Sequence, residues 1–201
     1  MKKTALVISY LFHPLLMPTL GLLIILNSGT YLSLLDPAAK RAIVFVMALG
    51  TLVFPLMILP VLQYRNLLVK NTMDLSGGER LLPQFIILVL YIITFVYFRR
   101  LPLSQVIHGY VLSVAATFLM IILLNLKVRI SLPTAALGGL AGLIIGLILL
   151  YQTPLEGFLI LTLLAGGLAG SSRMAQGDSW GNILSGFLVG FVVVLVTVLV
   201  Y

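Results

Sequence analysis

Charged residues are scarce in this sequence. They make up 8% of 201 positions, whereas hydrophobic residues make up 61%. A soluble domain carries about a quarter charged residues, so this chain cannot cover itself with a solvated surface. Lipid must contact most of its outside, and in lipid only helices or closed barrels satisfy every backbone amide. Apolar runs such as 85–98 and 186–201 lack the alternation of barrel strands. We therefore predict an all-α, polytopic transmembrane helix bundle that forms one domain over residues 1–201.

Cysteine is absent, and histidines and acidic residues are few. The lack of cysteine excludes disulfides and thiolate metal sites. Two histidines, His13 and His108, and five dispersed acidic residues cannot assemble a metal centre, so we expect neither a metal nor a cofactor. The twelve basic residues are scattered in ones and twos between apolar segments, as in membrane loops. The net charge of +7 therefore does not indicate a nucleic-acid partner.

Seven apolar segments are long enough, or nearly so, to span a membrane, which takes about 20 residues. They cover 5–27, 41–63, 83–98, 104–126, 133–151, 155–171 and 183–201. The third and sixth are short, so we predict six or seven passes and favour seven. Lys2 and Lys3 precede the first segment, which lacks a small-residue cleavage site and is therefore interpreted as a retained helix. We expect an integral membrane location, in the bacterial inner (cytoplasmic) membrane.

Three polar loops, 64–82, 127–132 and 171–182, are separated by pairs of apolar segments and must therefore share one membrane face. Together with Lys2 and Lys3, that face holds eight basic residues against four on the other, which favours a cytoplasmic position. If three of its arginines bind a ligand, the count falls to five against four. The orientation then stays open.

Glycines recur at four-residue spacing in the last three segments. The sets are Gly138, Gly142 and Gly146; Gly166 and Gly170; and Gly186 and Gly190. Small residues at this spacing let helix backbones approach closely in a membrane. We predict a tightly packed three-helix core, and a homo-oligomer formed through the same glycine-lined helices is the alternative.

Each loop of the shared face carries an arginine. The three motifs are Glu79–Arg80 with Pro83, Arg129–Ile130–Ser131 before Gly138 and Gly139, and Ser171–Ser172–Arg173 followed by Asp178 and Ser179. A guanidinium binds phosphate oxygens through two parallel N–H groups and keeps its charge at any relevant pH. Converging arginines would form a phosphate clamp, whereas a single arginine would anchor a helix end at headgroup level.

In order and spacing these motifs resemble those of the membrane-bound type-two phosphatidic acid phosphatases, the lipid phosphate phosphatases related to vanadium haloperoxidases. In that family a basic stretch ends in Arg and Pro, a Ser-His-type motif opens a helix, and a Ser-Arg is followed by His. Residues 79–83, 129–139 and 169–190 stand where these motifs belong, and residues 12–19 look like a subgroup with the same layout. The resemblance covers most of the chain and implies a lipid-phosphatase-like bundle that acts on phosphorylated lipids.

The chain departs from the family at the residues that carry the chemistry. The third-motif histidine, which attacks phosphorus, would stand at Ser179, and the aspartate that follows it at Ile183. The second-motif histidine, the general acid, would stand at Pro133, whose side chain cannot transfer a proton. Losing a nucleophile and its acid lowers the rate by several orders of magnitude. We therefore expect a pseudoenzyme that holds phosphate without cleaving it.

A phosphate site is the leading hypothesis, with a membrane lipid such as phosphatidate or a polyprenyl phosphate or pyrophosphate as its ligand. Its predicted residues are Arg80, Arg129, Ser172 and Arg173. A second hypothesis is an active lipid phosphatase with an altered nucleophile, Asp178 or Ser179. A third is a small transporter or structural membrane protein, which is supported by the proline-broken first segment.

Overall fold

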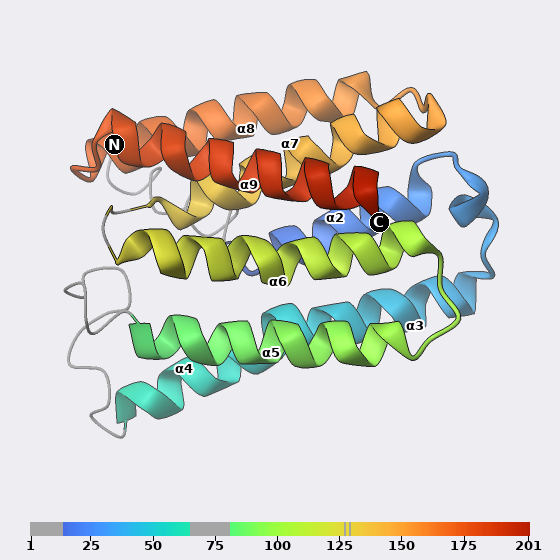
Figure 1. Cartoon of the computed structure of the whole chain (residues 1–201), viewed down its shortest axis with the longest axis horizontal. Coiled ribbons are helices and arrows are strands. Elements are labelled where there is room, and N and C mark those ends of the chain that lie inside the picture. The colour runs from blue at the N-terminus through green and yellow to red at the C-terminus, as the bar shows by residue number, and fades with distance from the viewer. Residues whose placement is uncertain (1–13, 65–80, 127, 129) are drawn as a thin grey trace.

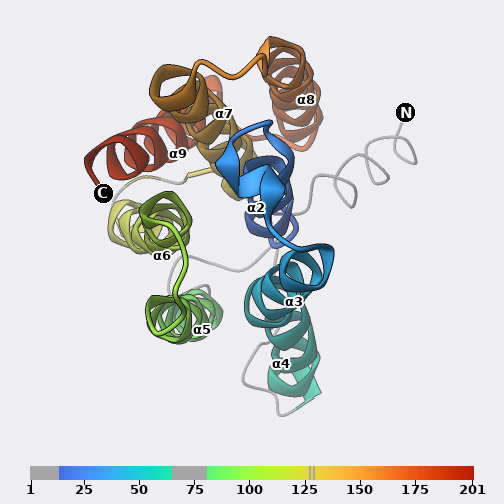
Figure 2. The ribbon, with the colours of Figure 1, turned by 90° about the vertical axis from the view of Figure 1, so that its right-hand side faces the viewer.

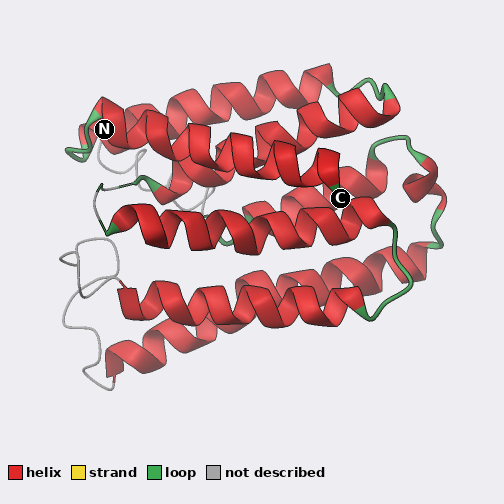
Figure 3. Cartoon of the chain, viewed as in Figure 1, coloured by secondary structure: helices red, strands yellow, loops and turns green. Residues whose placement is uncertain are grey.

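Helices form nearly the whole described part of the chain, and no strand occurs in that part (Figures 1 and 3). The computed structural model describes residues 14–64, 81–126, 128 and 130–201. In chain order its elements are α2 (Met17–Asn27), the 3-10 turn η1 (Tyr31–Leu34), α3 (Pro37–Ala48), the π turn η2 (Leu49–Val53), α4 (Phe54–Tyr64), α5 (Leu81–Arg99), α6 (Gln105–Asn125), α7 (Leu132–Tyr151), α8 (Glu156–Ala175) and α9 (Trp180–Val200). The all-α prediction is confirmed for the described residues.

Five of the described helices are long and apolar enough to cross a membrane. They are Pro37–Ile58, which runs through α3 and η2 into α4, together with α6, α7, α8 and α9. Met17–Asn27 and Pro83–Arg99 are shorter apolar helices. The arrangement fits an integral membrane protein, and each predicted segment overlaps a described helix. Residues 5–13 of the first segment lie outside the described ranges.

The long helices lie side by side, with their ends at two opposite edges of the molecule (Figure 1). The α6–α7 and α8–α9 connectors lie at one edge, and the α5–α6 and α7–α8 connectors lie at the other. The backbone N–H of Ser131, just before α7, donates to the carbonyl of Asn182 in the first turn of α9 (3.2 Å). This contact places the described ends of the 127–132 and 171–182 connectors together, as predicted for two loops on one face. Residues 65–80 of the third predicted loop lie outside the described ranges, so its place on that face stays a prediction.

A π turn lies within the second predicted segment. Pro55 has no N–H, so the carbonyl of Thr51 cannot receive the usual hydrogen bond from the fourth residue along. The ladder shifts by one residue, and the N–H of Phe54 donates to the carbonyl of Leu49. α3 and α4 therefore form one continuous helix with the π turn η2 inside it.

The sixth helix extends further than the sequence predicts. The polar stretch 171–182 is predicted to be a loop, but α8 continues to Ala175 and α9 begins at Trp180. The helix ends only where Gly177 takes a φ of +93°, a left-handed conformation that glycine adopts without strain. The prediction of a long loop is therefore wrong, because polar residues can continue a helix and the glycine ends this one. The connector shrinks to 176–179.

α7 is the central helix of the bundle, with α2, α8 and α9 around it (Figure 2), and 12 of its 20 residues are buried. A Cβ added to any of three glycines in α7 or α9 would overlap a carbonyl oxygen of the other helix. These are Gly138, Gly142 and Gly190. In α8, a Cβ added at Gly170 would meet only the side chain of Ile183 of α9, at 3.2 Å. The predicted close packing within one chain is confirmed for α7 and α9, whereas α8 approaches α9 through side chains.

Candidate functional site

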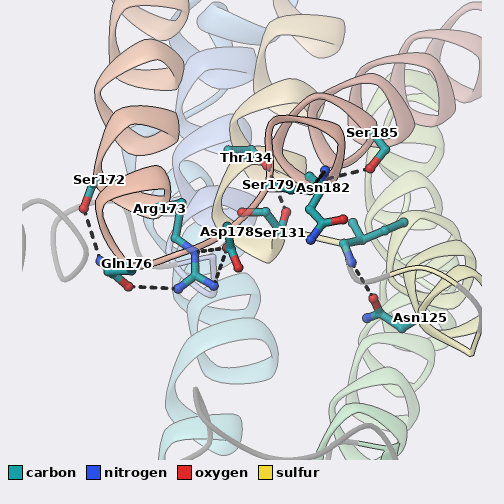
Figure 4. A network of polar contacts seen from close by, with 11 residues as sticks. Asn125, Ser131, Thr134, Ser172, Arg173, Gln176, Asp178, Ser179, Asn182 and Ser185 are labelled. Atoms are coloured by element: carbon teal, nitrogen blue, oxygen red, sulfur yellow. Dashed lines mark hydrogen bonds and ion pairs between the residues drawn. The ribbon is translucent and has the colours of Figure 1, made fainter.

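Arg173 lies in the last turn of α8, and its guanidinium lies beside the segment that leads into α9 (Figure 4). Its Nε and Nη2 both contact one carboxylate oxygen, Oδ2, of Asp178 at 2.7 Å. The two side chains are 17% and 9% exposed, so water screens this ion pair only partly. The backbone N–H of Asp178 also donates to the carbonyl of Arg173 (3.1 Å). The ion pair and the backbone hydrogen bond together close a tight corner between the two helices.

Gln176, which is not among the predicted site residues, extends this ion pair into a polar chain. Nη1 of Arg173 donates to Oε1 of Gln176 (3.1 Å), and Nε2 of Gln176 donates to Oγ of Ser172 (3.3 Å). The spacing carries a signal, because residues three and four apart share a helix face. We call Ser172, Arg173, Gln176 and Asp178 the α8 corner cluster. It brings together three of the predicted site residues, Ser172, Arg173 and Asp178.

Ser179 stabilises α9 and is not part of the cluster. Its Oγ accepts a hydrogen bond from the backbone N–H of Asn182 (3.3 Å), as an N-cap does. Among the described residues the one histidine is His108, which lies near the α5–α6 connector at the opposite edge of the bundle. There its Nε2 hydrogen-bonds to the carbonyl of Phe98 (3.0 Å). Neither Asp178 nor Ser179 therefore has a described imidazole within reach as a base.

The second motif lies at the same edge as the α8 corner cluster. The N–H of Ile130 donates to Oδ1 of Asn125 (2.8 Å), and the N–H of Ser131 donates to the carbonyl of Asn182, which anchors this connector beside α9 (Figure 4). Arg129 and Arg80 lie outside the described residues. Their convergence with Arg173 stays a prediction.

Arg173 keeps part of its donor capacity for a further acceptor. A guanidinium carries five N–H groups, and the contacts with Asp178 and Gln176 use three of them. Within the described ranges, no residue accepts a hydrogen bond from the other two. Because the side chain is already oriented, a phosphate bound there would not have to order it. The carboxylate of Asp178 opposes such binding, since it offsets the positive charge.

Comparison with known proteins does not assign a function to this site. No family model, no curated protein and no solved structure matches it. In the part of the chain that the structure describes, no three His, Cys, Asp or Glu residues gather where they could hold a metal ion. The resemblance to lipid phosphatases therefore rests on the sequence motifs and stays a prediction.

Proposed function

We propose that this protein binds the phosphate of an anionic membrane lipid at the α8 corner cluster and does not hydrolyse it. The observation that carries the proposal is the guanidinium of Arg173, held in place with two N–H groups left over. It sits at the end of a helix long and apolar enough to cross a membrane. Lipid phosphates lie at that level of a bilayer, so a head group of the phosphatidate or polyprenyl phosphate type could reach it. The bacterial cytoplasmic membrane is the proposed location.

Binding is favoured over cleavage because both candidate nucleophiles are already engaged. Oδ2 of Asp178 is paired with Arg173, and Oγ of Ser179 caps α9. An aspartyl-phosphate would require Asp178 to leave its partner and approach phosphorus as a free carboxylate. In the present arrangement Asp178 competes with a phosphate for the same guanidinium.

Trp180 provides a direct test. It is the single tryptophan of the chain, it is 69% exposed, and it lies two residues after Asp178. Lipids with brominated chains quench a nearby tryptophan, so the purified protein can be titrated with brominated phosphatidate against brominated phosphatidylcholine. We expect phosphatidate to bind on the order of tenfold more tightly, as one charge-assisted hydrogen-bond pair provides.

Three variants separate the proposal from its alternatives. Arg173→Ala should abolish the preference for phosphatidate, whereas Arg99→Ala, at the opposite edge of the bundle, should leave it intact. Asp178→Asn should strengthen phosphatidate binding, because the competing carboxylate is gone. An unchanged preference in Arg173→Ala contradicts the proposal. Release of inorganic phosphate from phosphatidate, abolished by Asp178→Asn, would instead identify a hydrolase with Asp178 as its nucleophile.

A further inference from the structure

An open groove runs between α2 and α8, with α7 at its bottom. Both helices pack on α7 (Figure 2). Leu20 and Leu23 line the groove from α2, and Phe158 and Leu161 line it from α8. All four side chains are exposed, so a large apolar surface on both walls requires a cover that the described residues do not provide.

The few polar side chains of this groove are already bonded within their own helices. Nδ2 of Asn27 donates to the carbonyl of Leu23 (2.8 Å), and Oγ1 of Thr162 donates to the carbonyl of Phe158 (2.8 Å). None of the described residues that line the groove is charged. Water is favoured only where unpaired polar groups can bind it, so this groove suits an apolar occupant.

The size of the groove fits one hydrocarbon chain. Its volume is about 520 Å³. A cavity of about 150 Å³ in another protein holds one benzene, so this volume takes roughly three times as many carbons, as in one acyl chain. The α2 wall runs from Met17 to Asn27. At a rise of about 1.5 Å per residue it is roughly 15 Å long, which is half of a hydrocarbon core of about 30 Å.

One end of the groove lies at the edge of the bundle where α7 is connected to α8. Asn27 and Leu155 line the groove at this end. Tyr31 and Tyr151 lie nearby in the sequence and form an edge-to-face pair with ring centroids 6.0 Å apart. Tyrosines are enriched at the interface between membrane and water. The groove therefore extends from head-group level at Asn27 toward the middle of the bilayer at Met17.

We propose that this groove binds one acyl chain of a membrane lipid, from the leaflet at the α7–α8 edge. Water does not fill an apolar groove at this depth, and lipid chains are the apolar material present there. Dispersion contacts with both walls and with α7 would hold the chain more firmly than the open bilayer does. The site is independent of the proposed phosphate site, because none of its lining residues belongs to the α8 corner cluster.

Leu161 and Leu164 of α8 form a matched pair for testing the proposal. They are 64% and 61% exposed, but only Leu161 lines the groove. The full chain is purified from vesicles of phosphatidylcholine that carries a photoreactive diazirine in one acyl chain, and it is irradiated after dilution into unlabelled detergent. A chain held in the groove stays bound, so we expect labelling at Leu161 and Leu20 several-fold above that at Leu164. Equal labelling of Leu161 and Leu164 overturns the proposal.

Two further variants show whether the groove wall holds the chain. Leu161→Ala should lower the labelling of Leu20, across the groove, several-fold, and Leu164→Ala should leave it unchanged. Unchanged labelling of Leu20 in Leu161→Ala contradicts the proposal. Arg173→Ala should not alter the labelling, so failure of the phosphate site and failure of the groove are distinguishable.

A second copy of the chain is the competing occupant, and a cysteine variant detects it. The sequence has no cysteine, so Leu161→Cys introduces a single thiol. We expect it to remain monomeric when it is oxidised in vesicles. A disulfide between two copies would show that protein covers the groove, and it would overturn the proposal.

Discussion

The contact between α7 and α9 and the contact between η2 and α5 both depend on glycine, but different atoms face the glycines. At Gly190 of α9, an added Cβ would overlap the carbonyl oxygen of Ala135 and lie 2.9 Å from the backbone nitrogen of Gly139. At Gly50 of η2, an added Cβ would overlap the side-chain Oγ1 of Thr94. A carbonyl oxygen inside a helix is fixed by the helix, whereas a threonine side chain can be changed or rotated. The first contact is therefore set by the backbone and the second by a side chain.

Gly190→Ala should produce the largest effect of the substitutions that test this comparison. The new methyl group pushes two helix backbones apart, so we expect a loss of about 3 kcal/mol in the free energy of unfolding. Thermal or denaturant unfolding in detergent measures it. Gly167→Ala on α8 is the matched control, because nothing lies within 4 Å of its added Cβ. Ala135→Gly should not rescue Gly190→Ala, since the overlapping atom is a carbonyl oxygen; a full rescue would show that the contact is not made by the backbone.

Gly50→Ala should have a smaller effect that a second substitution relieves. We expect a loss of about 1–2 kcal/mol, because the side chain of Thr94 must move. In the double variant with Thr94→Ala, most of that loss should be recovered, which a double-mutant cycle on the free energy of unfolding measures. Additive losses would mean that α5 cannot accommodate the methyl group even without the threonine hydroxyl.

Tyr110→Phe tests how α2 is attached to α6. Of these substitutions it should cause the smallest loss in the free energy of unfolding, about 1 kcal/mol. The substitution removes the hydroxyl that donates to the carbonyls of Met17 and Pro18 while the ring stays in place. Unfolding in detergent measures the effect, with Tyr97→Phe as the control, because Tyr97 is half exposed. A loss as large as that of Gly190→Ala would contradict the view that the backbone contact of α7 and α9 dominates stability.

The apolar segments predicted where the helices lie. A chain with so few charges is surrounded by lipid, and in lipid its backbone amides must be satisfied within helices or closed barrels. Glycine spacing likewise predicted close packing, but it could not decide between packing within one chain and between copies. That choice depends on which helix faces α7, which is a tertiary property. The polar residues Ser171 and Ser172 predict an earlier end for α8 than the structure shows, because the left-handed Gly177, and not polarity, ends the helix.

The candidate site was predictable only in part. Ser172, Arg173 and Asp178 were named from their motif, and the structure places all three in one hydrogen-bonded cluster. The ion pair between Arg173 and Asp178 depends on the turn at Gly177, and the sequence motif does not specify the geometry of that turn. The hydrogen bond between Ser131 and Asn182 joins two connectors that are distant in the chain, so no local pattern could have predicted it.

The contact between α7 and α9 also has a consequence for how the protein is made. α7 is synthesised before α9, and α8 returns the chain across the bundle between them, so α7 and α9 run in the same direction. During insertion, the glycine face of α7 has no backbone to pack against until α9 has emerged. Ribosomal pauses or truncations before Trp180 would leave that face open to other helices in the membrane. The corner at Arg173 and Asp178 would then help to set the register in which α9 arrives.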